Sequence, residues 1–143
     1  MTQVEFYSVE SADPKVPYSH MCEVIKRAYR KGQKVFVHTQ DRKQAETIDE
    51  LLWSLDAASF LPHQLADEAP DTKPPIEIGF GQNPAVKPDV LINMAAQVPQ
   101  FFSQFAWVFE YAWGDEEQKE LARNRFRFYR ERGYPLNHRK INS

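Results

Sequence analysis

The chain has 143 residues, of which 42% are hydrophobic and 13% aromatic. This is the composition of a single folded domain and excludes a disordered chain. We expect no secretion signal and no membrane-spanning helix, because no apolar run reaches the ~20 residues that a span requires. Cys22 is the only cysteine, which excludes an internal disulfide and fits a cytoplasmic protein.

Charge is distributed unevenly along the sequence. Residues 1–118 carry 10 basic and 18 acidic side chains, a net charge of −8, whereas residues 119–143 carry 8 and 2, a net charge of +6. A basic end of this kind binds nucleic acid, an anionic membrane surface or an acidic peptide. The acidic remainder disfavours the first two partners, because it would repel phosphate groups.

The first half of the chain alternates between strand and helix patterns. A strand is predicted at 4–9, a helix at 17–31 that ends before Gly32, and a strand at 34–39. Asp41 and Gln44 resemble a capping box. Apolar residues recur at helical spacing in both helices: Tyr18, Met21, Cys22, Ile25, Ala28 and Tyr29 in the first, and Ala45, Ile48, Leu51, Leu52 and Leu55 in the second.

The second half begins with a polar, Pro-rich loop at 66–75 and continues with strands predicted at 76–80 and 89–95. The apolar run 101–113 is interpreted as a short helical turn followed by a strand. A last helix is predicted over about 115–132, stopped by Gly133 and Pro135. We therefore expect one α/β domain over residues 1–143, with a mostly parallel central sheet flanked by helices.

Phosphate and metal sites are disfavoured by the sequence. No glycine-rich phosphate-binding motif is present, and "GFGQNPA" (79–85) is interpreted as a turn between two strands. The four histidines, His20, His38, His63 and His138, are scattered, and a single cysteine cannot form a zinc knuckle. We expect no cofactor and no metal.

A nuclease is the alternative enzymatic hypothesis. Asp89 follows a proline, and Glu117 and Lys119 form an E-x-K pattern, so the three residues formally fit a metal-dependent nuclease. In such a site the E-x-K residues lie on a strand beside the aspartate. Here they fall at the start of a predicted helix, which weakens this hypothesis.

The last helix carries a basic face that includes an aromatic residue. Lys119, Arg123, Phe126, Arg127 and Arg130 fall within about 100° of arc on a helical wheel, whereas Leu121 and Phe128 point elsewhere and are assigned to the core. The face is either an ordinary charged surface or a pocket for an acidic peptide with an apolar end, since arginine binds carboxylates bidentately. Stacking on single-stranded bases is a competing use of the same groups.

A second candidate surface lies in "LLWSLDAASFLPHQLA" (51–66), where the second helix leaves the sheet. It contains four large or apolar residues: Trp53, Phe60, Leu61 and Pro62. These residues are either core or an exposed apolar patch for a protein partner, because large aromatic residues are favoured anchors at interfaces.

Three stretches together resemble one protein family. "FYSVE" near the start, "DELLWSLDAASFLPHQL" in the middle and "ELARNRFRFYRERGYPLNH" at the end are similar to the chi subunit of bacterial DNA polymerase III holoenzyme, across essentially the whole chain. The resemblance implies a mononucleotide-binding (Rossmann-like) fold without a phosphate loop and without catalytic activity. It also implies an accessory subunit of the clamp-loader assembly in lagging-strand DNA replication.

The resemblance further implies two protein partners and a residue set for each. One partner is the psi subunit, bound as a heterodimer through Phe60 and Trp53. The other is the acidic C-terminal tip of single-stranded-DNA-binding protein, which ends in Pro-Phe. The tip would bind at four positions of the last helix: Lys119, Arg123, Phe126 and Arg127. DNA would then be contacted only indirectly, and the basic helix would serve an acidic protein tail.

Overall fold

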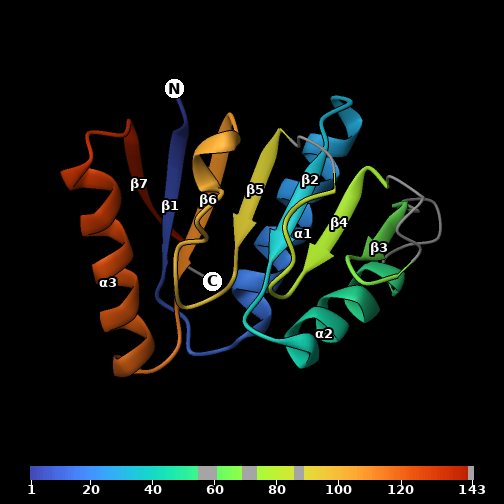
Figure 1. Cartoon of the computed structure of the whole chain (residues 1–143). Helices are drawn as coiled ribbons and strands as arrows, with labels where there is room; N and C mark the ends of the chain where they lie inside the picture. The colour runs from blue at the N-terminus through green and yellow to red at the C-terminus, as the bar shows by residue number, and fades with distance from the viewer. Residues whose placement is uncertain (55–60, 69–73, 86–88, 142–143) are drawn as a thin grey trace.

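The computed structural model describes residues 1–54, 61–68, 74–85 and 89–141. These residues form a sheet of seven parallel strands with three α-helices and one 3₁₀ turn (Figure 1). In chain order the elements are β1 (Gln3–Val9), α1 (Lys15–Arg30), β2 (Val35–His38), α2 (Arg42–Trp53), β3 (His63–Leu65), β4 (Ile76–Gly79), β5 (Val90–Asn93), η2 (Phe102–Gln104), β6 (Trp107–Ala112), α3 (Glu116–Glu131) and β7 (Leu136–Ile141).

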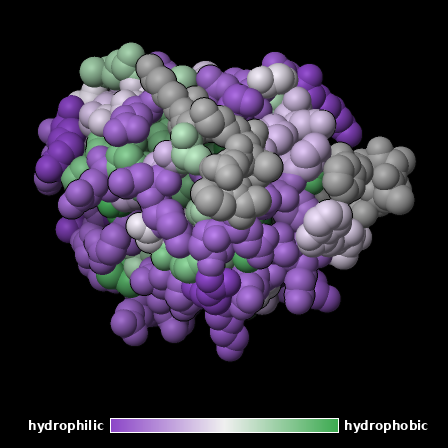
Figure 2. Space-filling view, turned by 45° about the vertical axis from the view of Figure 1, so that its right-hand side comes forward, coloured by the Kyte–Doolittle hydropathy of each residue, from purple (hydrophilic) through white to green (hydrophobic). Residues whose placement is uncertain are grey.

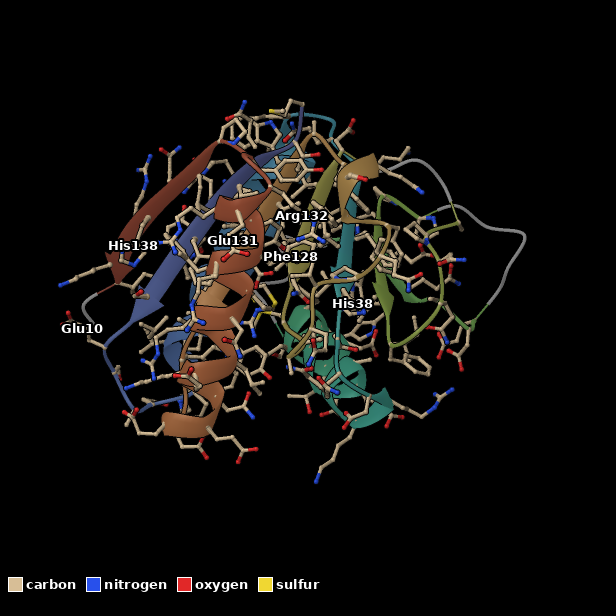
Figure 3. All side chains as sticks on the ribbon, turned by 60° about the vertical axis from the view of Figure 1, so that its left-hand side comes forward. Glu10, His38, Phe128, Glu131, Arg132 and His138 are labelled. Carbon is tan, nitrogen blue, oxygen red and sulfur yellow. The ribbon has the colours of Figure 1, made fainter. Side chains whose placement is uncertain are left out.

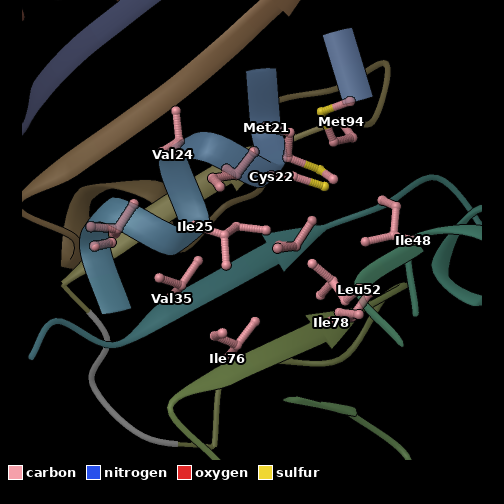
Figure 4. Close-up of a cluster of buried hydrophobic side chains, with 14 of the residues drawn as sticks. Met21, Cys22, Val24, Ile25, Val35, Ile48, Leu52, Ile76, Ile78 and Met94 are labelled. Carbon is pink, nitrogen blue, oxygen red and sulfur yellow. The ribbon is translucent and has the colours of Figure 1, made fainter. Parts of the chain in front are cut away.

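The strands follow the order β3-β4-β2-β5-β6-β1-β7 across the sheet. Successive side chains of a strand point to opposite faces, so each face has its own core. On one face α1 and α2 pack over Val35, Val37, Ile76 and Ile78 (Figure 4). On the other face α3 and η2 pack over Phe36, Leu91 and Val108. The predicted α/β class with a parallel sheet is confirmed.

The helices begin and end where the sequence predicts, within a few residues. The side chain of Asp41 accepts a hydrogen bond from the backbone N–H of Gln44 at 2.9 Å and caps α2. The Gln44 side chain bonds back to the N–H of Gln40 and not to that of Asp41, so the capping box is only half formed. Gly32, which follows α1, adopts a φ of 76°, as a helix-ending glycine should.

Two strands of the sheet were not predicted. β3 is a three-residue strand at one edge of the sheet, inside the stretch 51–66 that we interpreted as a helix exit. β7 forms the other edge, beyond Pro135, and pairs in parallel with β1 from Val4–Leu136 to Val9–Ile141. Its residues 137–140 are exposed polar or charged side chains, so the strand lacks the apolar alternation by which strands are recognised.

On the side of the molecule where β3 and β4 lie, the surface is mostly hydrophilic, with small groups of hydrophobic residues between the polar ones (Figure 2). In the part of the chain that the structure describes, no helix is both long enough and apolar enough to span a bilayer.

Candidate functional site

α3 supplies the candidate site, and its ends are set by local hydrogen bonds. The Asp115 side chain accepts from the N–H of Gln118 at 2.9 Å and caps the N-terminus. At the other end Gly133 has a φ of 76°, and the N–H of Tyr134 donates to the carbonyl of Tyr129 at 3.2 Å. This is a Schellman motif, which requires a residue tolerant of the left-handed region at Gly133. Local hydrogen bonds therefore fix both ends of the helix that carries the basic face.

A buried polar network fixes the orientation of α3 on the sheet. Arg125 Nε donates to Glu110 Oε1 of β6 at 2.9 Å, and both side chains are almost fully removed from solvent. The other Glu110 oxygen accepts from Asn93 Nδ2 at 2.9 Å and from the Tyr129 hydroxyl at 2.7 Å. Arg125 also donates to the backbone carbonyls of Ala96 and Tyr111. The bonds that Arg125 and Tyr129 make constrain the rotation of α3 about its axis.

Burial of the network shifts the pKa values of Glu110 and Tyr129. Burial raises the pKa of the Glu110 carboxyl, and the Arg125 guanidinium and three hydrogen bonds oppose that rise. Burial, followed by the neighbouring Glu110, raises the pKa of Tyr129 well above its usual range. Tyr129 is therefore a neutral hydroxyl donor to the carboxylate at physiological pH.

The buried residues of α3 differ from those we predicted. They are Ala122, Arg125 and Tyr129. Phe128 is half-buried against the core beside Phe102, whereas Leu121 is half-buried and belongs to neither core cluster, so its assignment to the core was wrong. The sequence analysis did not identify Arg125 as a core residue, because nothing in the local pattern indicates that Glu110 is buried beneath it.

Next to its buried side, α3 borders a mainly apolar cleft of about 350 Å³. Arg123 and Phe126 line it together with β1, β6 and β7 residues, including Phe6, Ser8 and His138. Phe126 is half-buried, and its ring meets the edges of the Phe6 and His138 rings at centroid distances of 5.3 and 5.9 Å. His138 and Phe128 lie on opposite sides of α3 (Figure 3). Phe126 thus forms part of an open cleft wall, on the side of the helix away from Phe128.

The cations of the basic face lie on one side of the helix. Arg123 and Arg127 are about half exposed, and both are within 4 Å of the same carboxylate, Glu120. Lys119 is half-buried and forms no ion pair with a described residue. Arg130 lies near the Phe126 ring, at 6.0 Å from its centroid. Arg123 and Phe126 therefore line one cleft, and Arg123 and Arg127 share Glu120, whereas Lys119 and Arg127 are not among the described residues that line the cleft.

Trp53 lies at the C-terminal end of α2, next to the β3 edge of the sheet, whereas α3 and β7 lie at the other edge (Figure 1). Its side chain is 58% exposed, and its ring centroid is 4.7 Å from that of His63. Phe60, the other residue assigned to this surface, lies outside the described residues. The two candidate surfaces are therefore at opposite ends of the sheet.

The residues of the nuclease hypothesis do not converge. Asp89 precedes β5 at the amino ends of the parallel strands, where its carboxylate accepts from the N–H of Lys34 at 2.8 Å. Glu117 and Lys119 belong to the first turns of α3, which follows the carboxyl end of β6. The sheet separates them, so the hypothesis has no geometric support. Among the described residues, no group of three metal-ligating side chains is close enough to hold an ion.

A cleft of about 410 Å³ lies at the carboxyl ends of the central strands β2, β5 and β6. Nucleotides bind at such strand ends in related architectures, through free N–H groups of a loop. Here side chains of the protein occupy these groups: Asp41 accepts from the N–H of Gln44, and the Gln40 side chain accepts from the N–H of Ala96. The described residues at these strand ends form no phosphate loop.

Comparisons with known proteins show which family the chain belongs to. Residues 1–137 match the family model of the DNA polymerase III chi subunit, HolC. The chain is 38% identical over 141 residues to DNA polymerase III subunit chi of Pseudomonas aeruginosa, covering 99% of this chain and 98% of the relative. It is 36% identical over 118 residues to the Escherichia coli subunit, covering 82% and 80%, and 34% identical over 116 residues to the Haemophilus influenzae subunit, covering 80% and 81%. The chain therefore belongs to the family of DNA polymerase III chi subunits, which are accessory subunits of the replicative polymerase.

Proposed function

We propose that this chi-family protein is a non-catalytic adaptor that joins the psi subunit of the clamp-loader assembly to single-stranded-DNA-binding protein. The acidic C-terminal tip of the latter binds the outer side of α3, at Lys119, Arg123, Phe126 and Arg127. The single observation that supports this proposal is the cleft that Arg123 and Phe126 line together, which pairs a guanidinium with an apolar slot.

The chemistry of the cleft matches the end of such a peptide. A guanidinium binds a carboxylate through two parallel hydrogen bonds. The ring of a terminal phenylalanine would enter the apolar part of the cleft, among Phe6, Phe126 and His138, where edge-to-face contacts between rings are favourable. Few groups take part, so the expected affinity is micromolar. It should weaken with salt because Arg123 and Arg127 are about half exposed.

The psi partner is assigned to the other end of the sheet, at Trp53 and Phe60. A tryptophan that is 58% exposed is the kind of residue that anchors a protein interface. The separation of this surface from α3 lets both partners bind the same molecule.

Titration of a labelled acidic peptide ending in Pro-Phe tests the peptide site. We expect Arg123→Ala to weaken binding about tenfold or more, because a charge-assisted contact to a carboxylate is lost. Arg30→Ala is the matched control, since Arg30 is exposed in the last turn of α1 and makes no ion pair with a described residue. Equal affinities of the Arg123 variant and the control would refute the assignment of the site to α3.

A further inference from the structure

A carboxylate of α3 itself already pairs with two cations of the basic face. Glu120 Oε2 accepts from Arg123 Nε at 2.9 Å and lies 2.8 Å from Arg123 Nη2. The other oxygen, Oε1, lies 3.6 Å from Arg127 Nη2. One carboxylate therefore bridges the two guanidinium groups to which the proposed peptide would bind.

The helical spacing produces this arrangement. Glu120 precedes Arg123 by three positions and Arg127 by seven, so the three side chains lie along one side of the helix. Glu116 adds a second, looser contact, with its Oε2 at 3.7 Å from Arg123 Nη2. The face is thus partly neutralised around Arg123 and Arg127, whereas Lys119 has no ion-pair partner among the described residues.

An incoming carboxylate must either displace Glu120 or approach it at close range. Displacement breaks the ion pairs of Glu120 before the new contact forms, so the net gain from that contact is reduced by about 0.2–1 kcal/mol, the free energy typical of an exposed ion pair. Close approach without displacement places two negative charges side by side, which is unfavourable. In both cases Glu120 opposes the binding of an acidic ligand.

We infer that Glu120 is an internal competitor that lowers the affinity of α3 for acidic peptides and thereby tunes the exchange of the partner. The inference rests on the proposed peptide site. The ligand also makes other contacts, through the ring in the cleft and further acidic side chains beside Lys119, and these add to its contact with Arg123.

Glu120→Gln tests the inference in the same peptide titration. The amide keeps the size of the side chain but removes the charge that competes, so affinity should rise about two- to fivefold, the range expected for an exposed ion pair. The salt dependence of binding should also become steeper, because the face gains net positive charge. Glu131→Gln is the matched control: it makes the same charge change at an exposed position of α3 that forms no ion pair with a described residue. It should leave affinity nearly unchanged.

The outcomes separate this inference from the proposed function. If the wild type binds, Arg123→Ala does not, and Glu120→Gln behaves as Glu131→Gln does, the peptide site stands and the competitor role is wrong. Weaker binding by Glu120→Gln also overturns it, because Glu120 would then be holding the arginines in place for the ligand. If Arg123→Ala binds like wild type, the peptide site itself fails.

Discussion

Individual residues of α3 are divided between support of the fold and recognition. Phe126 and Phe128 are two positions apart and both half-buried, yet they contact different parts of the molecule. Phe126 meets Phe6 and His138 at the cleft, whereas Phe128 meets Phe102 of η2, and the Arg132 guanidinium lies 3.9 Å from its ring centroid. We therefore propose that the two phenylalanines have different roles, Phe126 in recognition and Phe128 in the core.

This division can be tested by substituting each phenylalanine. We expect Phe126→Ala to weaken binding of the acidic peptide more than fivefold, because the cleft loses a wall. Phe128→Ala should instead lower the free energy of unfolding by about 2–3 kcal/mol, at or below the lower end of the range for a fully buried ring because Phe128 is half-buried, and leave affinity within about twofold. Denaturant unfolding and the peptide titration, run on both variants, measure the two effects. Equal losses of affinity would contradict the division.

At the level of the element, the buried network determines which side of α3 faces outward. Arg125 lies two positions from Arg123 and two from Arg127, and it points into the protein because Glu110 accepts its hydrogen bond there. A rotation of the helix that exposed Arg125 would leave Glu110 buried without its cation, which is costly. The polar network thereby orients the face that we propose for peptide recognition.

Glu110→Gln should reveal this constraint. The substitution removes the charge that pairs with Arg125 and leaves a buried cation without its partner, so we expect a loss of about 3 kcal/mol in the free energy of unfolding. Urea unfolding followed by circular dichroism measures it. The exposed control Glu46→Gln on α2 should change stability by less than about 0.5 kcal/mol. A Glu110 variant as stable as that control would show that the network does not hold α3.

The sequence predicts the elements that have an apolar period or a clear end signal. The helix stripes, the Asp41 cap and Gly133 are local features, and the structure confirms them, except for Leu55 of the second stripe, which lies outside the described residues. β7 was missed because its exposed side chains are polar and its pairing with β1 joins positions more than 130 residues apart. The burial of Arg125 depends on its contact with Glu110 of another element, which a helical wheel does not contain. The ion pairs of Glu120 lie within α3 at three- and seven-residue spacing, so a wheel that included the acidic residues would have indicated them.

For the molecule as a whole, the parallel sheet keeps two surfaces apart. The Trp53 surface adjoins β3 at one edge, and the α3 cleft adjoins β7 at the other. An adaptor requires this separation, because two partners that share one surface would compete for it.

Independence of the two surfaces is therefore the expected behaviour. Trp53→Ala should weaken binding of the psi subunit and leave peptide affinity unchanged, whereas Arg123→Ala should do the reverse. Effects of well-separated sites add, so the double variant should show both losses and no coupling. Calorimetric titration with each partner measures this. A loss of peptide affinity in the Trp53 variant would indicate either coupling or misfolding, which its unfolding curve would distinguish.

The most direct test of the account is a map of amide chemical-shift changes as the acidic peptide ending in Pro-Phe is added to the labelled protein. We predict that the largest changes occur in α3 at Lys119, Arg123, Phe126 and Arg127 and in the cleft residues Ser8 and His138. Changes centred instead on the Trp53 end of the sheet, or at the carboxyl ends of the central strands near Gln40 and Ala96, would contradict the assignment of α3 as the recognition surface.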